Sequence, residues 1–260
     1  MKSIQSRDNP FFRDIVKLSG SARQRNQSGL TLLDGAHLLR AYLDNGRQPR
    51  HILLRATALQ DREISDLLER ATDVPVSQLD VRLFAELSEL KTPTGVIALI
   101  EIPQPDMPVG QSHFALLLED IQDPGNLGSM LRSAAAAGCD SVFLSQGCAD
   151  AWSPKVLRAA MGGHFALCIH ENQDLPGVAE SFAGTLVAAS LQATHSLYDC
   201  DLSGKVAFMV GNEGAGLSAA MLGLATHKIT IPMPGKVESL NAAAATAICL
   251  FEAVRQRQRP

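Results

Sequence analysis

The sequence predicts an α/β protein with two domains, each built around a mainly parallel β-sheet. Short apolar segments typical of buried strands alternate along the chain with segments of helical periodicity, which is the pattern of α/β proteins. One proline-rich stretch without periodicity interrupts this alternation before the midpoint. The chain has 260 residues, of which 46% are hydrophobic and 19% are charged, so it is long and apolar enough for two folded domains.

The elements expected before this interruption begin with a helix. Asn9 and Pro10 form a typical helix start, with a capping side chain before a proline at the first helical position, and an apolar periodicity follows over 11–18. This helix and the elements that follow it up to the linker make up a smaller N-terminal domain. Strands are then expected at 30–33, 51–54, 74–76 and 96–100, and helices at 36–43, 61–70 and 80–87.

Residues 102–112 are the expected linker, because they contain three prolines and one glycine and show no periodicity. We therefore divide the chain into an N-terminal domain at 1–103, a linker at 104–112 and a C-terminal domain at 113–260. In the C-terminal domain, helices are expected at 127–137, 154–161 and 178–182, with a long final helix from about Ser239. Strands are expected there at 114–118, 141–144, 166–169, 186–189, 206–210 and 229–231.

Composition argues against several classes of protein. We expect no membrane span, because an apolar stretch of roughly 18 residues is missing, and no signal peptide, because charges interrupt the N-terminal segment. The five cysteines are scattered without CxxC spacing, which is typical of reduced thiols in a cytoplasmic protein. Without an HExxH motif or a clustered His/Cys set, we expect no metal.

Charge is unevenly distributed along a chain whose net charge is −4. Residues 1–60 contain ten Lys and Arg against four Asp and Glu, whereas residues 61–112 contain four against ten. A basic segment on an acidic protein is expected where phosphates are neutralised, although a solvated helix surface would show the same pattern. Charge alone does not separate these two interpretations.

Polar residues that suggest chemistry concentrate at three strand-to-helix junctions of the C-terminal domain. Such junctions lie at the carboxyl ends of strands, where open α/β sheets bind ligands. At the first junction, Asn126 is expected to cap the helix that follows. Arg132 comes six residues later, near apolar positions of that helix, so we expect it to pair with a carboxylate in a salt bridge or with a phosphate.

The second and third junctions supply a carboxylate and a rigid loop. Three glycines surround Glu213, and glycine lets a backbone approach a ligand closely, although the GxxGxG spacing matches neither a dinucleotide fold nor a P-loop. At 229–241, two prolines and a glycine precede a helix that is apolar almost all round, so it is buried in the domain or against a second subunit. Ser239 and Asn241 lie at its N-terminus, as caps or facing a ligand.

Together the three junctions resemble the three motifs of the SpoU/TrmH family of RNA ribose methyltransferases. The matching segments are NLGSMLR at 126–132, GNEGAGLS at 211–218 and IPMPGKVESLN at 231–241. The resemblance covers about residues 113–260, and residues 8–101 resemble, more loosely, the substrate-binding domain of many members. One departure is Ala242 and Ala243, where many members carry Val-Ser; it thins the pocket wall but removes no reactive group.

The resemblance implies a fold and a cofactor that the alternation of elements would not predict. The C-terminal domain would carry the deep trefoil knot of the family, whereas alternation predicts an unknotted doubly wound sheet. S-adenosylmethionine would lie bent in the knot, held largely by backbone groups of Gly211, Ile231 and Leu240, and the chain would form a homodimer. The implied reaction is methyl transfer to a ribose 2′-hydroxyl; analogy with two-domain members favours ribosomal RNA as the substrate, and a transfer RNA 2′-O-methyltransferase is the alternative.

The resemblance also assigns roles to polar side chains. In the family the first-motif arginine, here Arg132, accepts or steers the hydroxyl proton, but a guanidinium with a pKa above about 12 is a poor base. We therefore expect Arg132 to hold an RNA phosphate and to polarise the hydroxyl, while Asn126, Glu213, Ser239 and Asn241 orient it and the ribose. The expected RNA-binding residues lie in the basic N-terminal domain: Arg7, Arg13, Lys17, Arg23 and Arg25.

Three other functions stay open at this point. One is a binding module that keeps the fold but acts only in ribosome assembly, which would not need the polar side chains of the three motifs. Another is a base methyltransferase with a similar fold, which would share many of these side chains. A dehydrogenase-like or other nucleotide-binding enzyme would need GxGxxG after a strand, which the sequence lacks. If the domain division is right, deleting residues 1–103 leaves cofactor affinity nearly intact.

Overall fold

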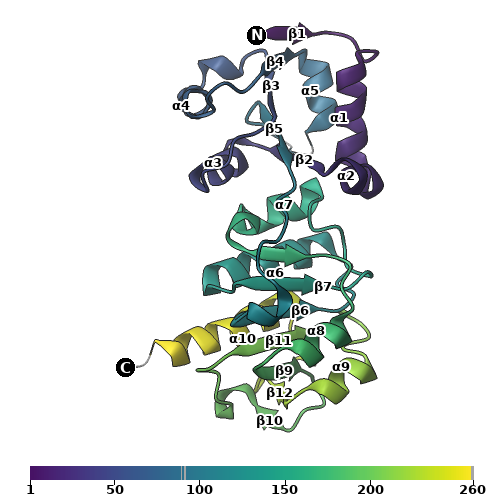
Figure 1. Cartoon of the computed structure of the whole chain (residues 1–260), viewed down its shortest axis with the longest axis vertical. Coiled ribbons are helices and arrows are strands. Elements are labelled where there is room, and N and C mark those ends of the chain that lie inside the picture. Colours follow the sequence, from purple (N-terminus) through teal and green to yellow (C-terminus); the bar gives the residue numbers. More distant parts are fainter. Residues whose placement is uncertain (89, 91, 259–260) are drawn as a thin grey trace. The chain divides into compact units, whose positions relative to one another are not determined.

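The computed structural model describes residues 1–88, 90 and 92–258. The chain divides into two compact units (Figure 1). Unit 1 comprises Met1–Pro103 and Trp152–Phe165, and unit 2 comprises Gln104–Ala151 and the chain from Ala166 onward. The predicted domains also include four residues that lie outside the described residues: Glu89, Lys91, Arg259 and Pro260.

The units differ from the predicted domains in two places. The predicted linker belongs to unit 2, where the thiol of Cys168 donates a hydrogen bond to Asp106 Oδ1 at 3.0 Å and Ser141 Oγ donates to Met107 Sδ at 3.6 Å. The linker is therefore attached to the strands that carry Ser141 and Cys168. In addition, Trp152–Phe165 was predicted inside the C-terminal domain but belongs to unit 1.

Unit 1 contains a mixed β-sheet. Its β1, β4 and β3 pair in parallel, whereas β5 pairs antiparallel with both β3 and β2. The sheet is therefore not mainly parallel as predicted, because an alternation of strands and helices does not fix the direction in which each strand returns. In sheet order the strands are β1 (Lys2–Ile4), β4 (Val76–Leu79), β3 (His51–Arg55), β5 (Val96–Glu101) and β2 (Leu30–Asp34).

The first helix of unit 1 begins where the sequence predicts. Asn9 accepts a hydrogen bond from Phe12 N at 3.3 Å and Pro10 occupies the first turn, which confirms the predicted helix start. Phe12, Ile15 and Leu18 are buried on one face of this helix and pack in the core of the unit. The helices encoded before residue 103 are α1 (Pro10–Gly20), α2 (Ala22–Ser28), α3 (Ala36–Asp44), α4 (Arg62–Arg70), α5 (Val81–Leu87) and the 3-10 turn η1 (Ala58–Gln60).

The remaining helix of unit 1, α7 (Pro154–Ala160), comes from the second half of the chain. It packs against β2, where Thr31 Oγ1 donates a hydrogen bond to the carbonyl oxygen of Trp152 at 2.7 Å. The rings of Tyr42 and Phe165 lie 5.1 Å apart, edge to face. A truncation at residue 103 would remove these partners of Trp152–Phe165, and the expectation that such a truncation leaves cofactor affinity nearly intact stays a prediction.

Unit 2 contains a parallel sheet, as predicted. Among the described residues, the seven strands of this sheet all pair in parallel, and the central strands are fully buried on both faces. The carboxyl ends of all these strands therefore lie at one edge of the sheet. In sheet order they are β10 (His195–Ser196), β12 (His227–Thr230), β9 (Thr185–Ala189), β11 (Val206–Val210), β6 (Phe114–Leu118), β7 (Ser141–Leu144) and β8 (Cys168–His170).

Two pairs of helices accompany this sheet. The helices α6 (Pro124–Ala137) and α10 (Ala242–Arg257) pack against each other, and α10 also contacts β11. The helices α8 (Leu175–Ser181) and α9 (Ala219–Leu224) form the other pair (Figure 1). Short 3-10 turns complete the unit: η2 (Val109–Gln111), η3 (Gly163–Ala166), which starts in unit 1, and η4 (Leu197–Asp199). Within the described part of the chain, no helix is both long and apolar enough for a membrane span.

The starts of α6 and α10 differ from the prediction, with consequences for the site. Asp123 caps α6 by accepting a hydrogen bond from Asn126 N at 2.7 Å, so Asn126 lies in the first turn and is not the cap. An equally good capping residue, Asp123, precedes it, and this leaves the Asn126 side-chain amide available for other contacts. The final helix starts at Ala242 rather than near Ser239, because Asn241 caps it.

Candidate functional site

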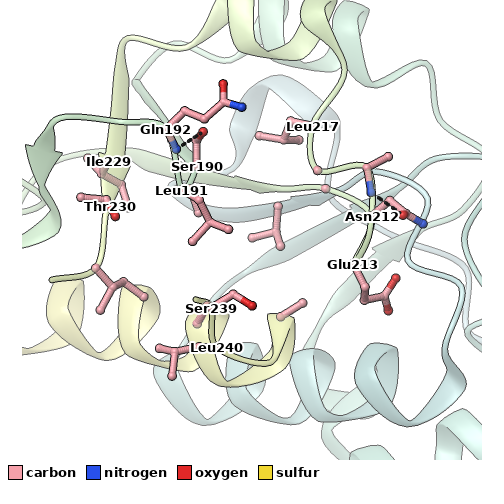
Figure 2. A pocket seen from close by; sticks show the side chains of 18 of the residues that line it. Ser190, Leu191, Gln192, Asn212, Glu213, Leu217, Ile229, Thr230, Ser239 and Leu240 are labelled. Atoms are coloured by element: carbon pink, nitrogen blue, oxygen red, sulfur yellow. Dashed lines mark hydrogen bonds between the residues drawn. The ribbon is translucent and has the colours of Figure 1, made fainter. Parts of the chain in front are cut away.

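Loops that follow three parallel strands enclose one cavity at the carboxyl edge of the sheet in unit 2. The three loops follow β9, β11 and β12, and the start of α10 also lines the cavity. The cavity volume is about 580 Å³. Figure 2 shows Ser190 and Gln192 on one side of this hollow, Asn212 and Glu213 on the other, and Ser239 with Leu240 beside α10. The loop after β6 does not line the cavity but contacts those that do. The site therefore lies where an open α/β sheet is expected to bind ligands.

A row of hydrogen bonds joins the three segments singled out in the sequence. Asn241 Nδ2 donates to Asn126 Oδ1 at 2.9 Å, and Asn126 Nδ2 donates to Glu213 Oε1 at 3.0 Å. Asn241, Asn126 and Glu213 are up to 115 positions apart in the sequence, so this contact depends entirely on the fold. The structure thus brings together three of the predicted catalytic residues at the edge of the cavity.

The direction of this row is fixed by the cap of α10. Asn241 Oδ1 accepts hydrogen bonds from Ala243 N and Ala244 N at 2.9 and 3.2 Å, so its amide nitrogen is the group left to face Asn126. The Asn126 oxygen must then accept, and its nitrogen must donate to Glu213. A carboxylate accepts without a proton of its own, so the row ends at an acceptor. Among the described residues, Glu213 Oε2 has no hydrogen-bond partner, and Glu213 is one of the residues that line the cavity.

The predicted cofactor-binding residues Gly211, Ile231 and Leu240 all line the cavity, and so does Ser239. A Cβ atom at Gly211 would lie 2.2 Å from the carbonyl carbon of Gly216, so only glycine fits where the two ends of this loop meet. Leu240 is 36% exposed, although it is apolar. An exposed leucine on a cavity wall is available for contact with an apolar part of a ligand.

Arg132 lies apart from the cavity. It is exposed on α6 and does not line the hollow, and among the described residues its guanidinium has no hydrogen-bond or ion-pair partner. Of the two expected partners, the carboxylate is not found among the described residues, which an exposed guanidinium tolerates because it stays solvated, and pairing with a phosphate stays a prediction. Its predicted catalytic role stays a prediction.

Sequence reasoning missed two groups of residues. The loop after β9 supplies Ser190, Leu191 and Gln192 to the cavity wall, and the only signal for it was a polar pair directly after a predicted strand. Asn212, inside the second segment, was passed over between two glycines, yet it also lines the cavity and bonds within its own loop.

The five predicted RNA-binding residues of unit 1 have different environments. Arg25 is only 4% exposed and donates to the carbonyl oxygens of Leu18 and Ser19 at 2.5 and 3.1 Å, so it is a structural residue and the prediction for it is wrong. A guanidinium that satisfies the last carbonyls of α1 is a helix C-terminal cap. The other four are exposed: Arg7, Arg13, Lys17 and Arg23.

Two of these four cations are paired on the surface. Arg7 makes a two-pronged ion pair with Glu86, with N–O distances of 2.5 and 2.7 Å, and Lys17 pairs with Asp14 at 3.0 Å. The hydrogen bonds between Arg7 and Glu86 raise the pKa of Arg7 and lower the pKa of Glu86. Within the described part of unit 1, Arg13 and Arg23 have no such partner. Arg7, Arg13 and Lys17 also line an open cavity of about 290 Å³ beside α1.

The cysteines and the potential metal ligands show no reactive arrangement in the described part of the chain. All five cysteines are free, and burial raises the pKa of the Cys249 thiol to about 12, so this thiol stays protonated near neutral pH. No group of three or more His, Cys, Asp and Glu side chains within 1–88, 90 and 92–258 is placed to hold a metal ion.

Two family models match the chain. The SpoU rRNA Methylase family matches residues 113–251, more than half of the chain, and the MRM3-like substrate binding domain matches residues 9–98. An uncharacterised tRNA/rRNA methyltransferase of Synechocystis is 36% identical over 98% of this chain and 94% of its own. RlmP of Bacillus subtilis, named as a 23S rRNA (guanosine(2553)-2′-O)-methyltransferase, is 33% identical over 96% of this chain and 98% of its own.

Solved structures agree with these matches. The SpoU methyltransferase AviRb from Streptomyces viridochromogenes superposes with a TM-score of 0.84 and 27% identity, covering 96% of this chain and 98% of its own. An AdoMet-bound rRNA methyltransferase from Sinorhizobium meliloti reaches 0.84 with 26% identity, covering 98% and 97%. These likenesses confirm the predicted fold class, a knotted C-terminal α/β domain with a mainly parallel sheet and a smaller N-terminal α/β domain.

Proposed function

The chain belongs to the SpoU rRNA methylase family, as its three motifs predict, and on that premise we propose that it methylates ribosomal RNA. It is an S-adenosylmethionine-dependent methyltransferase that acts on a ribose 2′-hydroxyl. The observation that carries the proposal is the row of hydrogen bonds Asn241–Asn126–Glu213, which ends at a carboxylate that lines the cavity. RlmP, which matches almost end to end, is named for ribosomal RNA, and this favours ribosomal over transfer RNA.

The cavity fits S-adenosylmethionine. Its volume lies within the range of roughly 300–1,000 Å³ that is usual for small-molecule sites. Leu191, Leu217 and Ile231 give it apolar walls, and Gly211, without a side chain, lets the backbone approach a ligand. The bound cofactor supplies an electrophilic methyl group on a sulfonium.

The polar row would orient the ribose for this transfer. Transfer to oxygen needs the hydroxyl in line with the methyl carbon and the leaving sulfur, and a fixed acceptor can hold the hydroxyl in that direction. Glu213 Oε2 is such an acceptor, because Asn126 already holds the other carboxylate oxygen in place. We propose that the ribose hydroxyl donates its hydrogen bond to Glu213, while Arg132, solvated on α6, takes an RNA phosphate.

Unit 1 is the proposed RNA-binding part, in line with its match to a substrate binding domain. Of the residues predicted to bind RNA, Arg13 and Arg23 are the strongest candidates, because both are exposed and neither has an ion-pair partner among the described residues. Arg7 and Lys17 would have to exchange a carboxylate partner for a phosphate.

We also propose a homodimer that forms on α10. Ala244, Ile248 and Phe251 follow one another at helical spacing on its outer side, and Phe251 is 47% exposed. The helix α6, which carries Arg132, packs against α10, so an interface on α10 would lie beside that arginine. Replacing Phe251 with glutamate is expected to yield a monomer in sedimentation equilibrium; an unchanged molecular mass would contradict this interface.

The function is tested with purified protein, labelled S-adenosylmethionine and bulk cellular RNA. Nuclease digestion and mass spectrometry should locate the new methyl group on a ribose oxygen of ribosomal RNA. Methylation of a base, or of transfer RNA alone, would contradict the proposal. Glu213→Gln and Arg132→Lys serve as the test variants: the first keeps the size of the side chain, the second keeps its charge but loses the planar guanidinium, and both are expected to lower turnover strongly.

A further inference from the structure

Two residues outside the cavity, Glu119 and Asp120, hold both ends of the loop at 211–218. They follow β6 directly. At the start of the loop, Asn212 Nδ2 donates to the carbonyl oxygen of Asp120 at 2.9 Å. At its end, Ser218 N donates to Glu119 Oε2 at 2.7 Å. Neither Glu119 nor Asp120 lines the cavity, whereas 211–217 do so without interruption.

The conformation of this loop depends on Asn212. Its Oδ1 accepts hydrogen bonds from Gly214 N at 2.9 Å and from Ala215 N at 3.0 Å, and its carbonyl oxygen accepts from Gly216 N at 2.9 Å. The Asn212 amide can make these bonds only in the orientation in which its nitrogen meets Asp120. The carbonyl oxygen of Asp120 therefore fixes the orientation of the Asn212 side chain, around which the loop turns.

Asp120 is itself held in an uncommon backbone conformation. Its φ is +55°, in the left-handed region, which a residue other than glycine adopts only when its surroundings stabilise it. Asp120 N donates to Ser145 Oγ at 2.9 Å, and Ser145 Oγ donates to Asp120 Oδ1 at 2.6 Å. A Cβ atom at Gly147 would lie 2.2 Å from Asp120 Oδ1, so a larger residue there would push the Asp120 carboxylate out of its position. The loop after β7 thus supports the loop after β6, which in turn supports the cavity wall.

We propose that Glu119 is a positioning residue for S-adenosylmethionine, acting through Ser218 on the loop that carries Glu213. Its carboxylate oxygen is the acceptor that holds the far end of this loop. Without it the loop would have to be ordered when the cofactor binds, which lowers affinity. The proposal rests on the cofactor assignment made above.

The experiment measures binding of S-adenosylhomocysteine to the full chain by calorimetry, which needs no RNA. Glu119→Ala is expected to weaken binding about 10-fold, the change that corresponds to about 1.4 kcal/mol. Glu119→Gln should bind nearly as tightly as the wild type, because its amide oxygen still accepts from Ser218 N. The matched control is Asp140→Ala: Asp140 also accepts from backbone amides, those of His113 and Phe114, but at the opposite edge of the same sheet.

A purely structural role for Glu119 predicts that both alanine variants melt earlier and that neither changes affinity. That result, or a Gln variant as weak as the Ala variant, would overturn the proposal. Should Glu119→Ala not fold, Ser218→Pro removes the donor instead, at a φ of −61° that suits proline, with Ser218→Ala as its control. Weak binding by the proline variant alone supports the proposal, and equal binding by both refutes it. A wild type that did not bind would refute the cofactor assignment as well.

Discussion

Replacing Asn241 with aspartate separates the two tasks of this side chain. Asn241 Oδ1 caps α10, and Nδ2 donates to Asn126. Aspartate is as good a cap as asparagine and carries a favourable charge at a helix N-terminus, so the helix should remain. It cannot donate, however, and the Asn126 amide would have to turn its nitrogen toward residue 241. The Asn126 oxygen would then face the carboxylate of Glu213, and that hydrogen bond would be lost.

The expected loss follows from the bond that breaks. A hydrogen bond to a charged group contributes about 1.5–3 kcal/mol, and about 1.4 kcal/mol corresponds to a factor of ten. If Glu213 must be held in place only while the methyl group is transferred, Asn241→Asp lowers kcat/KM roughly 10- to 100-fold. The thermal midpoint should stay close to that of the wild type. Asn241→Ala loses the cap as well and should cost about 1 kcal/mol of folding stability in addition.

The assay follows methyl transfer to RNA at several cofactor concentrations, with thermal unfolding of each variant alongside. A double variant provides an internal check: when Asn241→Asp is combined with Glu213→Gln, the new amide can donate to the turned Asn126 and the row re-forms in reverse. Its melting temperature should stay close to that of the wild type, although its turnover does not recover. Full turnover by Asn241→Asp alone would refute the claim that the direction of the row matters.

Three further predictions concern other parts of the chain. Gly211→Ala should abolish cofactor binding in calorimetry, because no space exists for a Cβ, whereas Gly223→Ala, with no atom within 4 Å of the added carbon, should bind normally. Arg25→Ala should reduce stability by about 1–3 kcal/mol without a specific effect on RNA, while Arg13→Ala should leave melting unchanged and lower the salt slope of RNA binding by about 1. The Arg7 partner lowers the pKa of Glu86, so their pair stabilises the fold above the ordinary glutamate pKa of about 4.3 and this effect is lost as pH falls. The difference in melting temperature between wild type and Glu86→Gln should therefore shrink in acid, and a constant difference would count against the pair.

Much of unit 2 could be predicted because its signals are local. Fully apolar strands that end in polar or glycine-rich junctions indicate a buried parallel sheet, and the carboxyl edge of such a sheet collects its loops. Asn126, Glu213 and Asn241 were found in this way. Their hydrogen-bond order could not be, since it depends on Asp123 taking over the cap of α6 and on Asn241 capping α10.

The missed features depend on distant partners. Arg25 belongs to a basic segment, and nothing in its neighbourhood shows that its guanidinium turns inward to the end of α1. Glu119 and Asp120 look like an ordinary acidic end of a strand until the loop after β11 meets them. The antiparallel course of β5 in unit 1 is likewise invisible to periodicity, which describes faces and not directions.

The membership of Trp152–Phe165 in unit 1 has a practical consequence for protein engineering. Unit 1, the proposed RNA-binding part, cannot be exchanged between relatives as one contiguous gene fragment, because the apolar side chains of α7 would then meet foreign partners on β2. A functional chimera has to exchange two segments together, Met1–Pro103 and Trp152–Phe165. Chimeras that exchange only the first segment should aggregate on expression, whereas chimeras that take both segments from the same relative should stay in solution.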